Sequence, residues 1–226
     1  MSTPISHRET VYGWIYLFIQ LFLLPAVLRS GNAMAGGLLS EAELNFLFFL
    51  INFLAIICIF HTFLGKSGKK LMQHPMYFLQ AVVLGLAAYF ACTFLFNHLI
   101  SWFRPGFVNL NDQGIQSMTR SSRFLMLVGT VVLVPPVEEC FYRGLIFRNL
   151  YPRSAWAAYL LSMLAFAAVH LLAFVGRLSL MDLFISLIQY LPAGLCLAWA
   201  YQKADTIYAP IVIHALINFW GIHSMR

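Results

Sequence analysis

Long apolar runs, separated by short polar stretches, make up most of this chain. A helix that crosses a lipid bilayer needs about 20 mainly apolar residues. We therefore predict an all-α fold, a polytopic membrane helix bundle in which residues 1–226 form a single integral membrane domain. About seven spans are expected, the last one short, at residues 11–28, 44–64, 76–103, 124–150, 155–175, 180–201 and 207–223.

The stretches between and within the spans predict where helices end. Residues 29–43, rich in Gly and Ser, predict a loop, and residues 65–70, GKSGKK, predict a turn. Residues 106–123 are the least apolar part of the chain and fit either a surface helix or a re-entrant cap. Pro135-Pro136 lie inside the fourth span, where they predict a kink or break that frees backbone carbonyls. Broken helices at membrane depth usually border a cavity.

Composition agrees with a membrane protein. The chain is 61% hydrophobic and 10% charged, a balance that a soluble domain of 226 residues could not bury. Its net charge of +6 suits loops that rest on anionic lipid, and no basic stripe interleaved with aromatic residues suggests nucleic-acid binding. The cysteines lack disulfide or metal spacing and are interpreted as small buried hydrophobes; they are Cys58, Cys92, Cys140 and Cys196.

Three charged residues interrupt the fourth span, in the sequence VPPVEECFYRGLIFR. A charge near the bilayer centre costs about 2.5–3.5 kcal/mol, so adjacent carboxylates there point to function. On a helix Glu139 and Arg143, at i and i+4, share a face and neutralise each other. Glu138 points about 100° away and remains available for chemistry. The plainer alternative is a buried ion pair that only fixes helix packing.

Two histidines and an asparagine lie inside later spans. Counting about 1.5 Å per residue from the turns on one side places Glu138, His170 and His214 about 20, 24 and 14 Å deep, so that all three can meet. Asn218 follows His214 by four residues and projects from the same face. Each residue alone is more often an interhelical hydrogen-bonding group. Together with a carboxylate, they supply what general-base hydrolysis needs.

These residues form three motifs that resemble one family, the type II CAAX prenyl endopeptidases and their bacterial relatives, also called the CAAX protease and bacteriocin-processing (Abi) family. The motifs occur in the family's order within residues 124–222, the expected catalytic core. They are Glu-Glu-x-x-x-Arg at Glu138, Glu139 and Arg143, Phe-x-x-x-His at Phe166 and His170, and His-x-x-x-Asn at His214 and Asn218.

The resemblance implies an intramembrane glutamic endopeptidase, for which family members can have eight spans. Glu138 would be the general base, His170 would orient the water, and His214 with Asn218 would stabilise the tetrahedral intermediate. Glu139 and Arg143 would be structural supports. The expected substrate is a peptide, a lipid-modified protein or a membrane-embedded protein.

Other functions remain open from the sequence. No metal is expected; zinc is the alternative cofactor and would use Glu138, His170 and His214, although the helical His-Glu-x-x-His spacing is missing. A catalytically silent membrane protein that serves bacteriocin immunity or regulates a signalling partner is the second functional hypothesis. A proton-coupled transporter is disfavoured because the chain has no internal repeat.

Charge also predicts an orientation in the cell membrane. With seven spans, the turns at residues 66–75, 151–154 and 203–206 share one side. Basic loops favour the cytoplasm, so this side is predicted to be cytoplasmic. Its basic residues are Lys66, Lys69, Lys70, Arg153 and Lys203.

Overall fold

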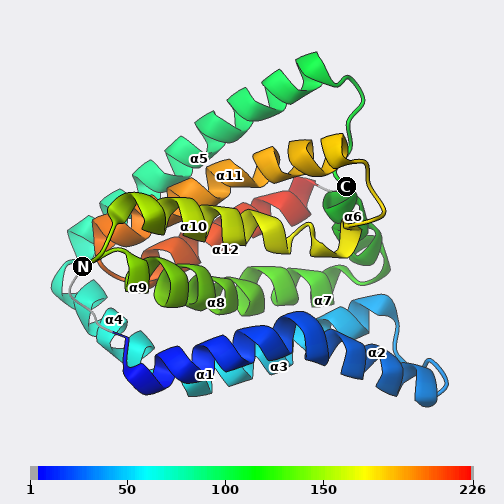
Figure 1. Cartoon of the computed structure of the whole chain (residues 1–226), viewed down its shortest axis with the longest axis horizontal. Coiled ribbons are helices and arrows are strands. Elements are labelled where there is room, and N and C mark those ends of the chain that lie inside the picture. The colour runs from blue at the N-terminus through cyan, green and yellow to red at the C-terminus, as the bar shows by residue number, and fades with distance from the viewer. Residues whose placement is uncertain (1–4, 225–226) are drawn as a thin grey trace.

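The computed structural model describes residues 5–224 as a bundle of helices (Figure 1). That part of the chain contains no strand, which confirms the predicted all-α class. Within residues 5–224, five helices are long and apolar enough to cross a membrane. They are His7–Met34, Glu41–Ile59, Pro75–Phe103, Arg123–Leu150 and Leu180–Ala204.

Two shorter apolar helices occupy the positions of the fifth and seventh predicted spans. Helix α10 (Ala155–Val169) has 15 residues and α12 (Tyr208–Ser224) has 17. At 1.5 Å per residue they measure about 22 and 26 Å, less than the hydrocarbon thickness of about 30 Å. The count of seven spans therefore stays a prediction.

The long helices and these two shorter ones alternate in direction, so the connections gather at two ends of the bundle (Figure 1). At the end that holds the N-terminus, Thr206 Oγ1 donates to the Ser67 carbonyl at 2.8 Å, and Lys70 Nζ lies 3.9 Å from Asp205 Oδ2. The three stretches that the sequence assigns to one side, residues 66–75, 151–154 and 203–206, lie at one end of the bundle (Figure 1).

The first long helix combines α1 (His7–Phe18), a π-helical turn η1 (Ile19–Leu23) and α2 (Leu24–Met34). It extends well into the predicted loop 29–43. Its start is held by a capping box between Ser6 and Glu9. Glu9 is buried, and its Oε1 also accepts from the Phe63 N–H at 2.7 Å, which ties α1 to the first turn of α4.

The turn predicted at residues 65–70 is wrong, because this stretch lies inside helix α4 (His61–Gln73). The chain bends earlier, at Phe60, where α3 (Glu41–Ile59) ends. Lysine is a good helix former, and burial of Phe63 and Leu64 fixes the start of α4, so the two glycines do not break it.

Helix α5 (Pro75–Phe103) follows and packs on the bundle mainly through its first half. Its buried residues are Ala81, Val82 and Gly85, and its second half diverges from the other helices (Figure 1). The next segment, for which the sequence left two possibilities, forms helix α6 (Leu110–Ser121) at the end of the bundle.

The fourth long helix is the central one. Buried residues make up 50% of its apolar stretch, against 17–22% in the three long helices before it. The sequence predicted a kink or break at Pro135 and Pro136, and the structure shows no break, because helix continues through both residues. The helix widens into a π-helical turn just before them, which moves the preceding carbonyls away from the proline rings. Its segments are α7 (Arg123–Leu127), η2 (Val128–Leu133), α8 (Val134–Glu139), η3 (Cys140–Phe147) and α9 (Arg148–Leu150).

The fifth predicted span, residues 155–175, is shorter in the structure. Helix α10 ends at Val169, and a 3₁₀ turn, η4 (Leu172–Phe174), leads into the connection to α11 (Leu180–Ala204). His170 therefore lies at the C-cap of α10 rather than within a span.

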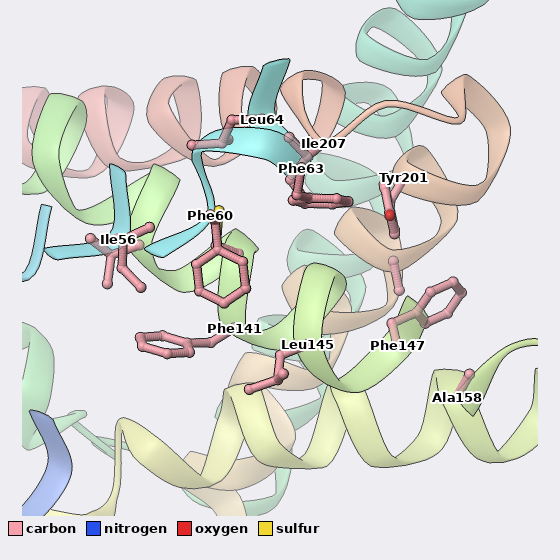
Figure 2. Packing of buried hydrophobic residues seen from close by; sticks show 13 residues of the cluster. Ile56, Phe60, Phe63, Leu64, Phe141, Leu145, Phe147, Ala158, Tyr201 and Ile207 are labelled. Carbon is pink, nitrogen blue, oxygen red and sulfur yellow. The ribbon is translucent and has the colours of Figure 1, made fainter. Parts of the chain in front are cut away.

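Aromatic and aliphatic side chains together form the core on one side of the central helix (Figure 2). Phe141 meets Phe60 edge-to-face at 6.3 Å between ring centroids, and Phe147 meets Tyr201 at 6.0 Å. These contacts join α3, α4, η3 and α11 around one cluster and fix the helix that carries the glutamates.

The cysteines divide into two groups. Cys140 and Cys196 are buried, as predicted, whereas Cys58 is exposed and Cys92 is half-buried. The prediction is wrong for Cys58, because an apolar run in a membrane helix has a face that points to lipid as well as a face that points to the bundle.

Candidate active site

Glu138 and Glu139 end helix α8, directly after the π-helical turn η2. In that turn the Val134 N–H bonds the Gly129 carbonyl, five residues earlier. With the same five-residue spacing, the Thr130 carbonyl would accept from the backbone N–H of residue 135. Pro135 has no N–H, so this bond cannot form. Asn218 of α12 supplies the donor, with its Nδ2 2.7 Å from the Thr130 oxygen. The prolines thus free a carbonyl, and a neighbouring helix binds it.

Glu139 is the centre of a buried charge cluster. Its Oε1 lies 3.1 Å from Nη1 of Arg143, and both side chains are fully buried. Arg143 also donates from Nη2 to the Gly194 carbonyl of α11 at 3.0 Å, and its guanidinium lies 4.8 Å from the centroid of the Phe166 ring on α10. The i,i+4 pair expected from the sequence is present, and it links three helices.

His214 of α12 joins the two glutamates. Its Nδ1 lies 2.8 Å from Glu139 Oε1. Because a carboxylate only accepts, Nδ1 carries the proton and donates. The other ring nitrogen, Nε2, then faces Glu138, whose Oε2 lies 4.0 Å away. One glutamate orients the imidazole and the other lies opposite its second nitrogen.

Glu138 differs from Glu139 in its surroundings. Its side chain is 18% exposed, whereas that of Glu139 is fully buried. It lines a cavity of about 40 Å³ between α8, α3 and the π-helical turn η1. Its Oε2 atom is buried and hydrogen-bonds to no group within residues 5–224. A carboxylate oxygen of this kind is available to bind and deprotonate a water molecule.

His170 lies apart from this cluster. Its Nδ1 bonds the Phe166 carbonyl at 2.8 Å, and its ring stacks on Tyr190 of α11 with 4.4 Å between centroids. The Phe166 ring contacts both imidazoles, with 4.9 Å between ring centroids for His170 and 5.7 Å for His214. Within residues 5–224 His170 forms no hydrogen bond, ion pair or ring contact with Glu138 or His214, whereas Glu138 and His214 lie 4.0 Å apart.

The same separation bears on zinc. Among the described residues, no group of three or more His, Cys, Asp or Glu side chains is arranged to hold a metal ion. The ligand set named from the sequence, Glu138, His170 and His214, is not assembled because His170 is turned toward Tyr190. The arrangement offers a carboxylate, an imidazole and an amide near a small cavity, which suits acid–base chemistry on a water molecule.

Residues 120–220 match the family model described as Type II CAAX prenyl endopeptidase Rce1-like. This part of the chain is an Rce1-like domain. It nearly coincides with the expected catalytic core, residues 124–222, and it contains all three motifs. No similar protein was found among curated sequences, and none among solved structures. The match supports a membrane protease at the general level, and with it a peptide or protein substrate.

The helices before the Rce1-like domain contribute polar residues to the site that the motifs do not include. Gln20 of η1 and Asn52 of α3 line the same cavity as Glu138. Both are isolated polar residues in apolar spans, and this is the signal that could have revealed them, since buried polar groups in membranes are costly and usually have a role. Gly194 and Thr130 act through backbone carbonyls, which a sequence motif does not reveal.

Proposed function

We propose that this protein is an intramembrane glutamic endopeptidase in which Glu138 activates a water molecule for attack on a peptide bond. One observation supports this most strongly: Glu138 lines a small cavity beside His214, and its buried Oε2 finds no hydrogen-bonding partner within residues 5–224. Its neighbour Glu139 is instead held by Arg143 and His214. The two carboxylates are thereby divided into a reactive one and a structural one.

In the proposed reaction, a water O–H transfers its proton to the Glu138 carboxylate while the water oxygen bonds to the scissile carbonyl carbon. The carbonyl oxygen becomes an oxyanion, and the proton held by Glu138 then passes to the leaving nitrogen as the C–N bond breaks. Glu138 returns to its ionised form, so no other reactant is needed.

The oxyanion is assigned to His214 and Asn218. His214 would donate from Nε2 when both ring nitrogens are protonated, and the Glu139 carboxylate at Nδ1 balances that charge. Asn218 has two amide protons, of which one is bonded to the Thr130 carbonyl. Its second N–H remains for the oxyanion. His170 enters the proposal through its motif alone, as the residue that orients the water.

We also propose that catalysis proceeds without a resident metal, because the three candidate ligands are not gathered at one point. Metal analysis of the purified protein, with activity measured before and after chelator treatment, tests this. Activity that survives the chelator is expected. Stoichiometric zinc whose removal abolishes cleavage would overturn the proposal.

Comparative peptidomics tests the proposed function and finds the substrate in one experiment. Membranes with the wild type are compared with membranes that carry Glu138→Ala, and with Glu41→Ala as a matched control at an exposed glutamate. We expect cleavage products that disappear in Glu138→Ala only. Identical product sets in all three, with Glu138→Ala rescuing a deletion phenotype at normal protein levels, would instead indicate a non-catalytic immunity or regulatory protein.

A further inference from the structure

We propose that Gln20 and Asn52, which lie outside the Rce1-like domain, position the attacking water against Glu138. This inference rests on the proposed function. It assigns a catalytic contribution to the first two membrane helices, which the motifs and the family match leave without one.

Three buried oxygen atoms, on residues that line one cavity, carry the argument. Gln20 Oε1, Asn52 Oδ1 and Glu138 Oε2 are all buried and find no hydrogen-bond partner within residues 5–224. All three residues line the cavity of about 40 Å³. The side chains of Gln20 and Asn52 are more than nine-tenths buried, at 7% and 2% exposed. A buried polar atom without a partner is costly, so three around one space call for a shared donor.

Local structure constrains two of these side chains. Asn52 donates from Nδ2 to the Phe48 carbonyl at 2.7 Å, which settles its amide orientation and leaves Oδ1 without a partner within residues 5–224. Gln20 lies in the π-helical turn η1, which precedes Pro25 as η2 precedes Pro135. Such turns redirect side chains and are frequent at functional sites. Gln20 and Glu138 thus both reach the cavity from helices that are widened next to a proline.

Water fits the chemistry and the size of this space. All three groups are acceptors, and a water molecule offers two O–H donors: one for Glu138, to which the proton is transferred, and one that the two amide oxygens share. A single water needs roughly 10–15 Å³ of such volume, so the cavity has room for about two or three. When the amide oxygens accept the second O–H, a lone pair of the water points away from the amides.

A purely structural role fits the geometry less well. Polar residues that join membrane helices do so by bonding across the interface. Gln20 and Asn52 are on adjacent helices, yet neither amide oxygen bonds the other residue or any further group in the described part of the chain. Their oxygens are therefore placed for a ligand rather than for each other.

The test compares Asn52→Leu and Gln20→Met with Asn45→Leu. Asn45 is a matched control because it lies on the same helix and donates to the carbonyl four residues earlier, that of Glu41, as Asn52 does to Phe48. It does not line the cavity. We expect Asn52→Leu and Gln20→Met each to lower kcat about tenfold, the effect of one lost orienting hydrogen bond, with KM unchanged. Asn45→Leu should leave kcat at the wild-type value.

Substrate binding provides a second readout that structural damage and direct substrate contact would change. In the inactive Glu138→Gln background, adding Asn52→Leu should leave the substrate Kd unaltered. Equal kcat in Asn52→Leu and Asn45→Leu, or a weakened Kd, would overturn the inference. If Asn52→Leu fails to assemble, Gln20→Met decides, because methionine keeps the side-chain length. Full turnover by Glu138→Gln alone would contradict the proposed function itself, so the two failures are distinguishable.

Discussion

At the scale of single residues, Glu138 and Glu139 show how neighbouring identical side chains acquire different properties. Glu139 is fully buried and accepts from Arg143 and His214 through one oxygen. Glu138 Oε2 hydrogen-bonds to no group within residues 5–224, and the residue lines a cavity. Burial of an ion is tolerable only when its charge is paired, so removing one member of the Glu139 pair should destabilise the fold far more than changing Glu138.

We predict that Glu139→Gln lowers the free energy of unfolding by about 3–5 kcal/mol, because it leaves the buried Arg143 charge without compensation. Glu138→Gln is the matched comparison and should unfold nearly as the wild type does. Thermal or denaturant unfolding in detergent measures both. An equal loss of stability in the two variants would show that the assigned division between them is incorrect.

Asn218 is predicted to have two separable roles. Asn218→Ala should cost about 1–3 kcal/mol of stability by leaving the Thr130 carbonyl unpaired, and should lower kcat about 10²–10³-fold with little change in KM. In a Pro135→Ala background, the new N–H can bond that carbonyl, so the stability cost should shrink while the loss in kcat remains. Normal kcat per folded Asn218→Ala molecule would reject the oxyanion role.

At the scale of elements, close contact between α10 and α11 holds the charge cluster in place. A Cβ added at Gly194 would lie 3.0 Å from Met163 Cα and 3.2 Å from its carbonyl oxygen, and neither backbone atom can move alone. The Gly194 carbonyl is also the acceptor for Arg143. Separation of these two helices would therefore disturb the support of Glu139.

We expect Gly194→Ala to destabilise the protein by about 1–3 kcal/mol through overpacking and to reduce turnover by displacing the Arg143 acceptor. Gly221→Ala on α12 is the control, because a Cβ there meets no atom of residues 5–224 within 4 Å. It should be neutral or stabilising by up to about 1 kcal/mol. Unfolding curves and turnover that do not differ between the two variants would argue against tight packing at Gly194.

The sequence predicted the membrane helices and the motif residues because both depend on local patterns. Apolar length alone indicates a span, and i,i+4 spacing alone pairs Glu139 with Arg143. Helix ends were less predictable. Packing of Phe63 outweighs the glycines of α4, and a π-helical turn accommodates Pro135 without a break. The position of His170 depends on where α10 ends, which its uniformly apolar sequence does not mark.

At the scale of the whole molecule, alternating helices place the connections at two ends of the bundle (Figure 1). The proposed roles of Gln20 and Asn52 also depend on the whole molecule. Their side chains share a cavity with Glu138 only because three separate helices pack together. Motifs confined to residues 120–220 could not reveal that meeting. We propose that the end with the lysine-bearing connections faces the cytoplasm.

Cysteine scanning tests this arrangement in a background without the native cysteines. We expect Lys66→Cys, Arg153→Cys and Lys203→Cys to be labelled from one side of sealed membranes, and Glu41→Cys and Arg177→Cys from the other. These two sets lie at opposite ends of the bundle. Labelling of positions 66 and 153 from opposite sides would refute both the span count and the topology.

The most direct test of the central claim is the turnover of purified Glu138→Gln on the substrate identified by peptidomics. Glutamine keeps the size of the side chain and removes its capacity to take a proton. General-base catalysis contributes about 10²–10⁴-fold, so kcat should fall by at least that factor while the melting temperature stays near that of the wild type. A folded Glu138→Gln protein with kcat within tenfold of the wild type would contradict the assignment of Glu138 as the base.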